Sequence, residues 1–421
     1  MSTLSLPSEP TDGGLVGSRW TVSAATLAAI AVAGAMVTSS IVFSEPAVAD
    51  VLMAAVIVGL PMLGVVRFGN AAILNFVLWL VLVALSLAAC SVSTAFSTAL
   101  THQVVTLFLA LGAFVLAGYI SADPEPRFRL VMVCYVVACL VASLAALAGY
   151  FQIVPGMNEL FTNYGRARGT FKDPNVLGAA LAPAVIFLAW VALRGPLRHV
   201  LLAAAASLPL VLALLLSFSR GAWASVALSL VLVGWLALVT TRRAEDFRRL
   251  IAVAALGMVA LVVAIGGALQ VDAVASLFQE RASFDQSYDA GPEGRFGGQA
   301  KAVALILENP FGIGTHTFRN TYHEEEAHNV YLSQFLNAGW VGGLAYVISV
   351  LGTLAAGFYA LRRRSRLQGP LIIATAAFAG LVFEGFVVDT DHWRHFFVFM
   401  ALIWGLVDAE GASAGRGGPS S

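Results

Sequence analysis

The sequence predicts an all-α integral membrane protein with about twelve transmembrane helices and one large hydrophilic segment that contains short helices. Three observations support this fold class. Hydrophobic residues make up 59% of the 421 residues and charged residues only 11%, a balance that excludes an ordinary soluble protein. Apolar runs recur along nearly the whole chain, and about 20 apolar residues let a helix cross the hydrocarbon core of a bilayer. Only one long stretch, near residues 270–326, interrupts them.

The apolar runs divide the chain into five parts. A polar cytoplasmic lead covers residues 1–20, and nine membrane helices follow in residues 21–269. Residues 270–326 form the hydrophilic segment, residues 327–409 carry three more membrane helices, and residues 410–421, rich in Gly, Ser and Ala, are expected to be a disordered cytoplasmic tail. The predicted spans lie near 21–43, 47–66, 71–92, 102–121, 128–153, 174–193, 199–217, 221–240, 249–269, 329–361, 370–388 and 393–409.

The distribution of Lys and Arg predicts that both termini lie in the cytoplasm. If every span crosses once from an inner N-terminus, the two most basic short loops, TRRAEDFRR and RRRSR, fall inside, as the positive-inside rule expects. The opposite orientation would export them. Nine of the 24 Lys and Arg then remain outside: Arg166, Arg168, Lys172, Arg220, Arg281, Arg295, Lys301, Arg319 and Arg394.

Two of the outer arginines stand at expected helix starts. Arg220 follows Ser217 and Ser219, which can cap a helix, and Arg295 opens a helix in the hydrophilic segment that should stop before Pro310. A helix N-terminus disfavours a cation by itself, but its free amide groups form a ready anion site. An arginine at such a place therefore suits a bound phosphate, with ordinary loop charge as the alternative.

A second group of outer cations lies in the loop after the fifth span. Arg166, Arg168 and Lys172 occur in YGRARGTFKDPN, whose glycines permit tight turns and whose Asp173-Pro174 pair predicts the start of the sixth span. These cations could contact an anionic ligand or could be ordinary loop charges.

The stretch AHNVYLSQFLNAGWVGG organises the end of the hydrophilic segment. It is expected to place His328 and Asn329 at the mouth of an apolar helix, with a hinge at Gly339 and Gly342. We expect the helix to begin near His323, with Glu324–Glu326 in its first turn. A neutral imidazole at His328 can accept a proton from a hydroxyl, or it can serve only as a capping or packing side chain.

No metal site or cofactor is expected. His323 and His328 are one residue too far apart for the H-E-x-x-H zinc motif, and histidines five apart on a helix point in different directions. The last outer loop brings Asp389 and Arg394 to the membrane edge.

Several of these motifs together resemble a known family. His328-Asn329, nine residues, Gly339, two residues and Gly342, together with SFSRG, the Arg295 helix and its NPFGIG exit, are similar to segments of the O-antigen ligase superfamily. This superfamily comprises bacterial polytopic membrane glycosyltransferases that act as O-antigen ligases or as O-antigen and exopolysaccharide polymerases.

The resemblance implies a metal-independent glycosyltransferase of the bacterial inner membrane. Its donor would be a glycan on undecaprenyl pyrophosphate, and its acceptor a hydroxyl of a lipid A core or another saccharide at the periplasmic face. It implies no cofactor and no nucleic acid partner. Arg220 and Arg295 would hold the pyrophosphate and His328 would be the catalytic base, while further donor or acceptor contacts could come from Arg166, Arg168, Lys172, Asn329, Arg319, Asp389 and Arg394.

Three other functions stay open at this point. A polymerase of lipid-linked repeats shares the same motifs. A lipid-linked-glycan transporter would be a similar helical bundle, but should carry charges at mid-membrane depth. A non-catalytic partner in polysaccharide assembly would bind the same lipid without turnover.

Overall fold

The computed structural model describes residues 23–153, 155–240, 244–282, 291–292 and 294–416. Helices dominate this part of the chain, whose only sheet is a short antiparallel pair of β1 (Thr162–Asn163) and β2 (Arg166–Ala167). The predicted all-α membrane fold is confirmed. The cytoplasmic lead expected over residues 1–20 lies outside the described residues.

The long apolar helices stand where the spans were predicted. By length and composition alone, nine helices among the described residues can cross a membrane, and three shorter apolar helices occupy the other predicted positions. The nine are α3 (Asn70–Ala89), α4 (Phe96–Ala122), α5 (Pro124–Tyr150), α7 (Pro174–Arg194), α8 (Leu197–Leu216), α9 (Arg220–Thr240), α10 (Ala244–Ala268), α13 (Val330–Ala360) and α15 (Arg394–Arg416). The shorter three are α1 (Ala24–Thr38), α2 (Val48–Met62) and α14 (Gln368–Glu384).

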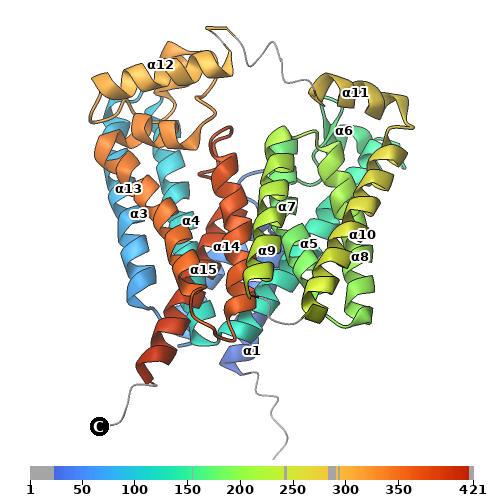
Figure 1. Cartoon of the computed structure of the whole chain (residues 1–421). Helices are drawn as coiled ribbons and strands as arrows, with labels where there is room; N and C mark the ends of the chain where they lie inside the picture. The colour runs from blue at the N-terminus through green and yellow to red at the C-terminus, as the bar shows by residue number, and fades with distance from the viewer. Residues whose placement is uncertain (1–22, 154, 241–243, 283–290, 293, 417–421) are drawn as a thin grey trace, which may run out of the picture.

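Short helices gather at one end of the bundle. They are the 3₁₀ turn η1 (Cys90–Val92), α6 (Met157–Phe161), α11 (Asp272–Ala282), α12 (Arg295–Glu308) and the π-helical turn η2 (Phe318–Tyr322). In Figure 1, α11 and α12 lie at the top, whereas the start of α1 and the end of α15 lie at the bottom. The described ends of the chain therefore share the side opposite to the short helices.

Large apolar side chains remain exposed on the outer faces of several long helices. Val231 of α9 is 68% exposed, Val263 of α10 is 67% exposed and Leu344 of α13 is 53% exposed. Apolar surface on this scale would be a liability in water, whereas hydrocarbon tails cover it without cost. The exposure pattern agrees with a bundle that is surrounded by lipid.

The prediction of a disordered tail from residue 410 is wrong for residues 410–416. Helix α15 continues to Arg416, and Glu410 is buried and accepts a hydrogen bond from the Ser365 hydroxyl in the loop before α14. This contact between residues far apart in sequence holds the helix beyond its apolar part. Residues 417–421 lie outside the described part of the chain.

Helix α13 is broken at Gly339, which confirms the predicted hinge at this residue. Gly339 has φ +71° and ψ −172°, a conformation that strains any side chain. The NPFGIG turn replaces the lost helical bonds: Trp340 donates its N–H to the Pro310 carbonyl at 2.9 Å, and Ile313 donates to the Leu336 carbonyl at 2.7 Å. In an unbroken helix, Trp340 would bond Leu336 directly. Gly342 keeps ordinary helical geometry, so the bend is confined to Gly339.

Candidate functional site

Three elements that carry candidate site residues meet at the end of α14. Val330, the first residue of α13, donates its N–H to the Gly385 carbonyl at 2.9 Å. Gln299 of α12 donates to the Phe386 carbonyl at 3.5 Å. At the start of α9, a β-carbon on Gly221 would lie 3.3 Å from a methyl carbon of Val387. Residues 384–387 therefore connect the N-terminal parts of α9, α12 and α13.

Arg220 is the first residue of α9, as predicted. The buried Ser219 accepts a hydrogen bond on its Oγ from the Ala222 N–H at 3.3 Å, and Ser217 Oγ accepts from the Ser219 N–H at 3.4 Å. The serine capping expected from SFSRG is thus present. Phe218 adopts a positive φ of 47°, an uncommon backbone state for a bulky residue, and so turns the chain sharply into α9.

Arg295 is the first residue of α12, again as predicted, and the helix ends at Glu308 before Pro310. The cap residue is Gly294, which has no side chain that could accept a hydrogen bond from the N-terminal amides. Beneath α12 lies a small apolar cluster, separate from the main core, made of Ala302, Ile313, Phe318, Ala327 and Leu336. This cluster fixes α12 against the residues that lead into α13.

His328 lies before α13, so the prediction of a helix that begins near His323 is wrong. Asn329 is the N-cap: its Oδ1 accepts from the N–H groups of Tyr331 at 3.1 Å and Leu332 at 3.3 Å. His328 has a φ of +47°, a left-handed state that interrupts any helix. The Asn329 cap therefore decides where the helix starts, and Glu324–Glu326 lie in the loop ahead of it.

The His328 ring is paired with a carboxylate. Its Nε2 lies 3.0 Å from Oε2 of Glu325, and the histidine side chain is 33% exposed. A carboxylate on one ring nitrogen orients the imidazole and leaves the other nitrogen for proton transfer. The Asp389 carboxylate accepts a hydrogen bond from Ser333 Oγ, in the first turn of α13, at 2.6 Å. The last outer loop is in this way attached to the helix that follows the histidine.

The two carboxylates of that loop have opposite protonation tendencies. Burial, and next the negative charge of the neighbouring Asp391, raise the pKa of Asp389 to about 7 against the opposing effect of the Ser333 hydrogen bond. Burial also acts to raise the pKa of Asp391, but hydrogen bonds from His102 and Gln334 outweigh it and hold that pKa below the usual range. The pair can therefore carry one negative charge, on Asp391, near neutral pH.

The three cations of the loop before α7 contact other residues of the chain. Arg166 donates to the Ser217 carbonyl and to Asn175 Oδ1, both at 2.7 Å, and so holds its loop against the turn before Arg220. Arg168 donates to the Glu159 carbonyl at 3.3 Å. Lys172 lies 3.2 Å from the carboxylate of Glu45, in an exposed pair. Arg319 is exposed in η2.

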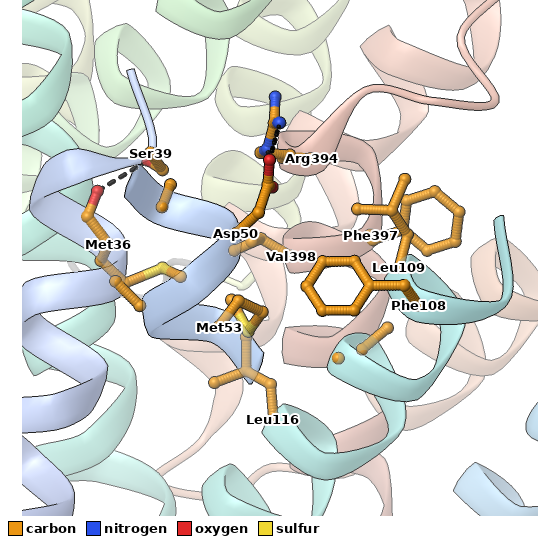
Figure 2. A pocket seen from close by; sticks show the side chains of 14 residues that line it. Met36, Ser39, Asp50, Met53, Phe108, Leu109, Leu116, Arg394, Phe397 and Val398 are labelled. Carbon is orange, nitrogen blue, oxygen red and sulfur yellow. Dashed lines mark hydrogen bonds and ion pairs between the residues drawn. The ribbon is translucent and has the colours of Figure 1, made fainter. Parts of the chain in front are cut away.

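Arg394 forms the best-defined ion pair among the described residues. Its Nε and Nη2 donate to the two carboxylate oxygens of Asp50 at 2.8 and 2.7 Å. Figure 2 shows the pair at one end of a small pocket between α1, α2, α4 and α15, whose other labelled lining is mostly apolar. Bidentate Arg–carboxylate pairs are directional as well as strong, so this contact ties the start of α15 to α2.

Within the described part of the chain, one cluster could hold a metal ion, although no metal site was expected from the sequence. His102 of α4 lies with Asp391 and His392 so that their ligand atoms are all within 4.8 Å of one another. Hydrogen bonds also account for the arrangement: His102 Nε2 lies 3.2 Å from Asp391 Oδ2, and Thr106 Oγ1 lies 2.9 Å from His392 Nε2. The two rings stack with centroids 3.7 Å apart, which does not aim both lone pairs at one ion.

Sequence reasoning missed this cluster for a simple reason. His102 and Asp391 are separated by 289 positions, and His102 sits in an apolar span with no local motif around it. Only the packing of α4 against α15 brings them together.

A comparison with protein-family models matches the part of the chain that carries the motifs described above. Residues 205–347 match the family model described as O-Antigen ligase, a stretch that contains Arg220, Arg295, His328 and the kink at Gly339. A comparison with curated proteins finds no match.

Proposed function

We propose that the chain is a member of the O-antigen ligase superfamily, whose model matches residues 205–347 and whose members are glycosyltransferase-like ligases and polymerases. In this proposal it transfers a glycan from undecaprenyl pyrophosphate to an acceptor hydroxyl. The acceptor is a lipid A core or another saccharide, and the reaction occurs at the periplasmic face of the bacterial inner membrane. The observation that carries the proposal is the meeting of α9, α12 and α13 at residues 384–387. Two of these helices begin with arginine, and the partly exposed His328 lies just before the third.

The proposed chemistry follows from these residues. Arg220 and Arg295, with the amides of their helix N-termini, hold the donor pyrophosphate. As the bond between the sugar and the pyrophosphate oxygen breaks, the electron pair stays on the phosphate, where prearranged cations stabilise it. The acceptor hydroxyl attacks the sugar carbon and gives its proton to His328. The proposed reaction uses no metal, and it needs no nucleotide because the sugar–pyrophosphate bond supplies the free energy.

The orientation is part of the proposal. The inner placement of TRRAEDFRR and RRRSR puts α11 and α12 in the periplasm and both termini in the cytoplasm. Single cysteines at Asn320 and Ser365, in a background without Cys90, Cys134 and Cys139, test it. An impermeant thiol reagent should label position 320 in intact cells and position 365 only after permeabilisation, and the reverse pattern contradicts the orientation.

We favour a ligase over a polymerase. A polymerase holds two pyrophosphate lipids at once and needs a second set of cations. The available second set is Arg166, Arg168 and Lys172, and each of these already contacts the protein. The polymerase remains the second candidate, because the three cations lie in one loop that Arg166 joins to the turn before Arg220.

A reconstitution experiment separates the candidates. Purified protein in liposomes receives the lipid-pyrophosphate-linked glycan alone, or together with a lipid A core acceptor. The ligase should form product only when the acceptor is present, whereas a ladder of repeats from the donor alone identifies a polymerase. Binding of the donor without turnover in either arm identifies a transporter or a non-catalytic assembly partner.

A further inference from the structure

Glu384, the last residue of α14, is a buried acid that the site described above does not use. It is 0% exposed, and neither carboxylate oxygen has a hydrogen-bond partner among the described residues. An ionised carboxylate in such surroundings would cost many kilocalories per mole, and even a neutral acid loses its bonds to water. Intramembrane carboxylates are retained chiefly where they have a function.

The packing of α9 against α14 aims Glu384 at the first turn of α9. The two helices approach closely at Gly380, where a β-carbon would lie 2.2 Å from Ser229 Oγ and 2.7 Å from Ser225 Oγ. One turn further along α14 and one turn back along α9, a β-carbon on Gly221 would lie 3.4 Å from Glu384 Oε1. The helices are therefore antiparallel, and the carboxyl group adjoins the residue that follows Arg220.

The position of Glu384 beside the first turn of α9 determines whether the ionised or the protonated carboxyl group could assist a bound pyrophosphate. The first-turn amides of α9 and the Arg220 guanidinium attract an anion, and an ionised carboxylate beside them would repel a pyrophosphate. A protonated carboxyl group has no such conflict, since its O–H donates a hydrogen bond to a phosphate oxygen. Apolar surroundings are known to keep a carboxylic acid neutral for this purpose.

We propose that Glu384 is a further catalytic residue, which as a neutral carboxylic acid donates a hydrogen bond to the pyrophosphate as it leaves the sugar. The proposal rests on the proposed function. The bond between the sugar carbon and the phosphate oxygen breaks, and its electron pair stays on the oxygen that faces the Glu384 O–H. The proton remains on Glu384, and the only proton transferred passes from the acceptor hydroxyl to His328.

Three variants test the role. Glu384→Gln keeps a donor in nearly the same volume, Glu384→Leu removes it, and Thr375→Val is the matched control. Thr375 lies on the same helix, is also 0% exposed and has a hydroxyl with no partner among the described residues. Glu384→Leu should lower kcat roughly 100-fold or more, as loss of a donor at a developing charge does. The kcat of Glu384→Gln should stay within about tenfold of the wild-type value. The kcat of Thr375→Val should equal the wild-type value.

Thermal unfolding separates this role from a packing role. A buried polar group kept for function weakens the fold, so Glu384→Leu should melt at the wild-type temperature or above it. Full activity in Glu384→Leu, or equal loss in Glu384→Gln and Glu384→Leu, overturns the proposal. A lower melting temperature of Glu384→Leu also overturns it, since the side chain then serves the fold.

Binding of inorganic pyrophosphate to the purified full-length protein keeps this inference distinct from the proposed function. Glu384→Leu should weaken binding at least about tenfold, the value of one charge-assisted hydrogen bond, and Thr375→Val should leave it unchanged. If wild type binds pyrophosphate with this dependence but transfers no glycan, the proposed function fails and the donor role of Glu384 stands. If wild type transfers glycan and Glu384→Leu binds pyrophosphate normally, only the Glu384 proposal fails.

Discussion

The N–H of Val330 donates to the carbonyl of Gly385 at 2.9 Å, so the start of α13 is joined directly to the end of α14. His328 stands two residues before this bond, and Ser333 in the first turn of α13 donates its hydroxyl to Asp389 at 2.6 Å. The loop that carries the histidine and the loop that follows α14 are therefore held together as one unit. The position of His328 depends on α14 as much as on its own helix.

Replacement of either helix-start arginine should remove the anion site. Arg220→Ala and Arg295→Ala should each lower transfer about 10²–10³-fold while the protein still inserts, because each removes charge that stabilises the leaving group. Lysine should restore only part, since a point charge lacks the guanidinium fork. Transfer assays with liposomes measure this. Arg281→Ala, in α11, is the control: an equal loss there would mean that outer positive charge matters only in bulk.

His328→Ala should lose turnover and keep the donor. We expect a fall of about 10²–10⁴-fold in kcat, the usual contribution of a general base, with unchanged binding of the lipid pyrophosphate. Glu325→Gln should cost less than about tenfold, because Glu325 only orients the ring and is 68% exposed. Weakened lipid binding in His328→Ala would assign the histidine a structural role instead.

The bend in α13 should depend on glycine at position 339. In Gly339→Ala the new β-carbon would lie 2.4 Å from the Pro310 carbonyl oxygen, at a φ of +71°. Strain of this kind costs about 1–3 kcal/mol for the backbone alone, so the melting temperature should fall clearly. Gly352→Ala in the same helix meets nothing within 4 Å and should melt like wild type. Equal melting of both variants would contradict the kink.

The Asp50–Arg394 pair should serve the fold and not the substrate. Asp50→Ala leaves the Arg394 guanidinium without its carboxylate partner. For a fully buried pair this lowers the free energy of unfolding by about 3–5 kcal/mol. The loss should be smaller here, because the side chains of Asp50 and Arg394 are 18% and 22% exposed. The double variant Asp50→Ala with Arg394→Met should regain stability, since no charge is left unpaired. Thermal melting and transfer per folded molecule are the measurements. An inactive but stable double variant would show that Arg394 contacts substrate.

Asp389 should make stability depend on pH. Burial raises its pKa in the folded protein to about 7, against about 3.9 in an unfolded chain. Between these values the folded state holds a proton that the unfolded state has lost, so stability should fall as pH rises from about 4 to about 7 and then level off. The change in stability with pH is smaller than for a fully buried acid, because Asp389 is only half-buried and water screens its charge.

Asp389→Asn is the matched test of this dependence. The variant should flatten the decline in melting temperature between about pH 4 and pH 7, because asparagine does not titrate. An identical decline in wild type and variant would assign it to other groups. The contribution of Asp391 to stability depends on pH in the opposite direction. Because its pKa is lowered in the folded protein, Asp391 stabilises the fold above about pH 4, and this stability is lost as the pH falls further.

Local signals in the sequence were sufficient for the helices and several of their ends. Runs of about 20 apolar residues predicted the positions of the nine long apolar helices and of three shorter ones among the described residues. Ser217 and Ser219 predicted the start at Arg220, Pro310 the end of the Arg295 helix, and Gly339 the break in α13. These features depend on side chains within about four positions, the range over which caps, turns and helix breakers act.

Prediction from neighbouring residues failed in two places. The run Glu324–Glu326 is typical of a first helical turn, yet Asn329 caps the helix and His328 takes the left-handed state. Gly and Ser near residue 410 indicated disorder, but the Ser365–Glu410 hydrogen bond extends α15. A distant contact decided the second case, and a stronger cap decided the first.

The sequence by itself determined the membrane-spanning helical architecture, the arginine-first starts of α9 and α12, and the match of residues 205–347 to the O-antigen ligase family model. Only the tertiary structure decided that α9, α12 and α13 meet at residues 384–387, that Arg394 pairs with Asp50, and that Glu384 faces Gly221. The physical reason is distance along the chain. Helix periodicity and helix caps depend on neighbouring residues. The partners of Glu384 and Arg394 depend instead on which small residues let two helices approach.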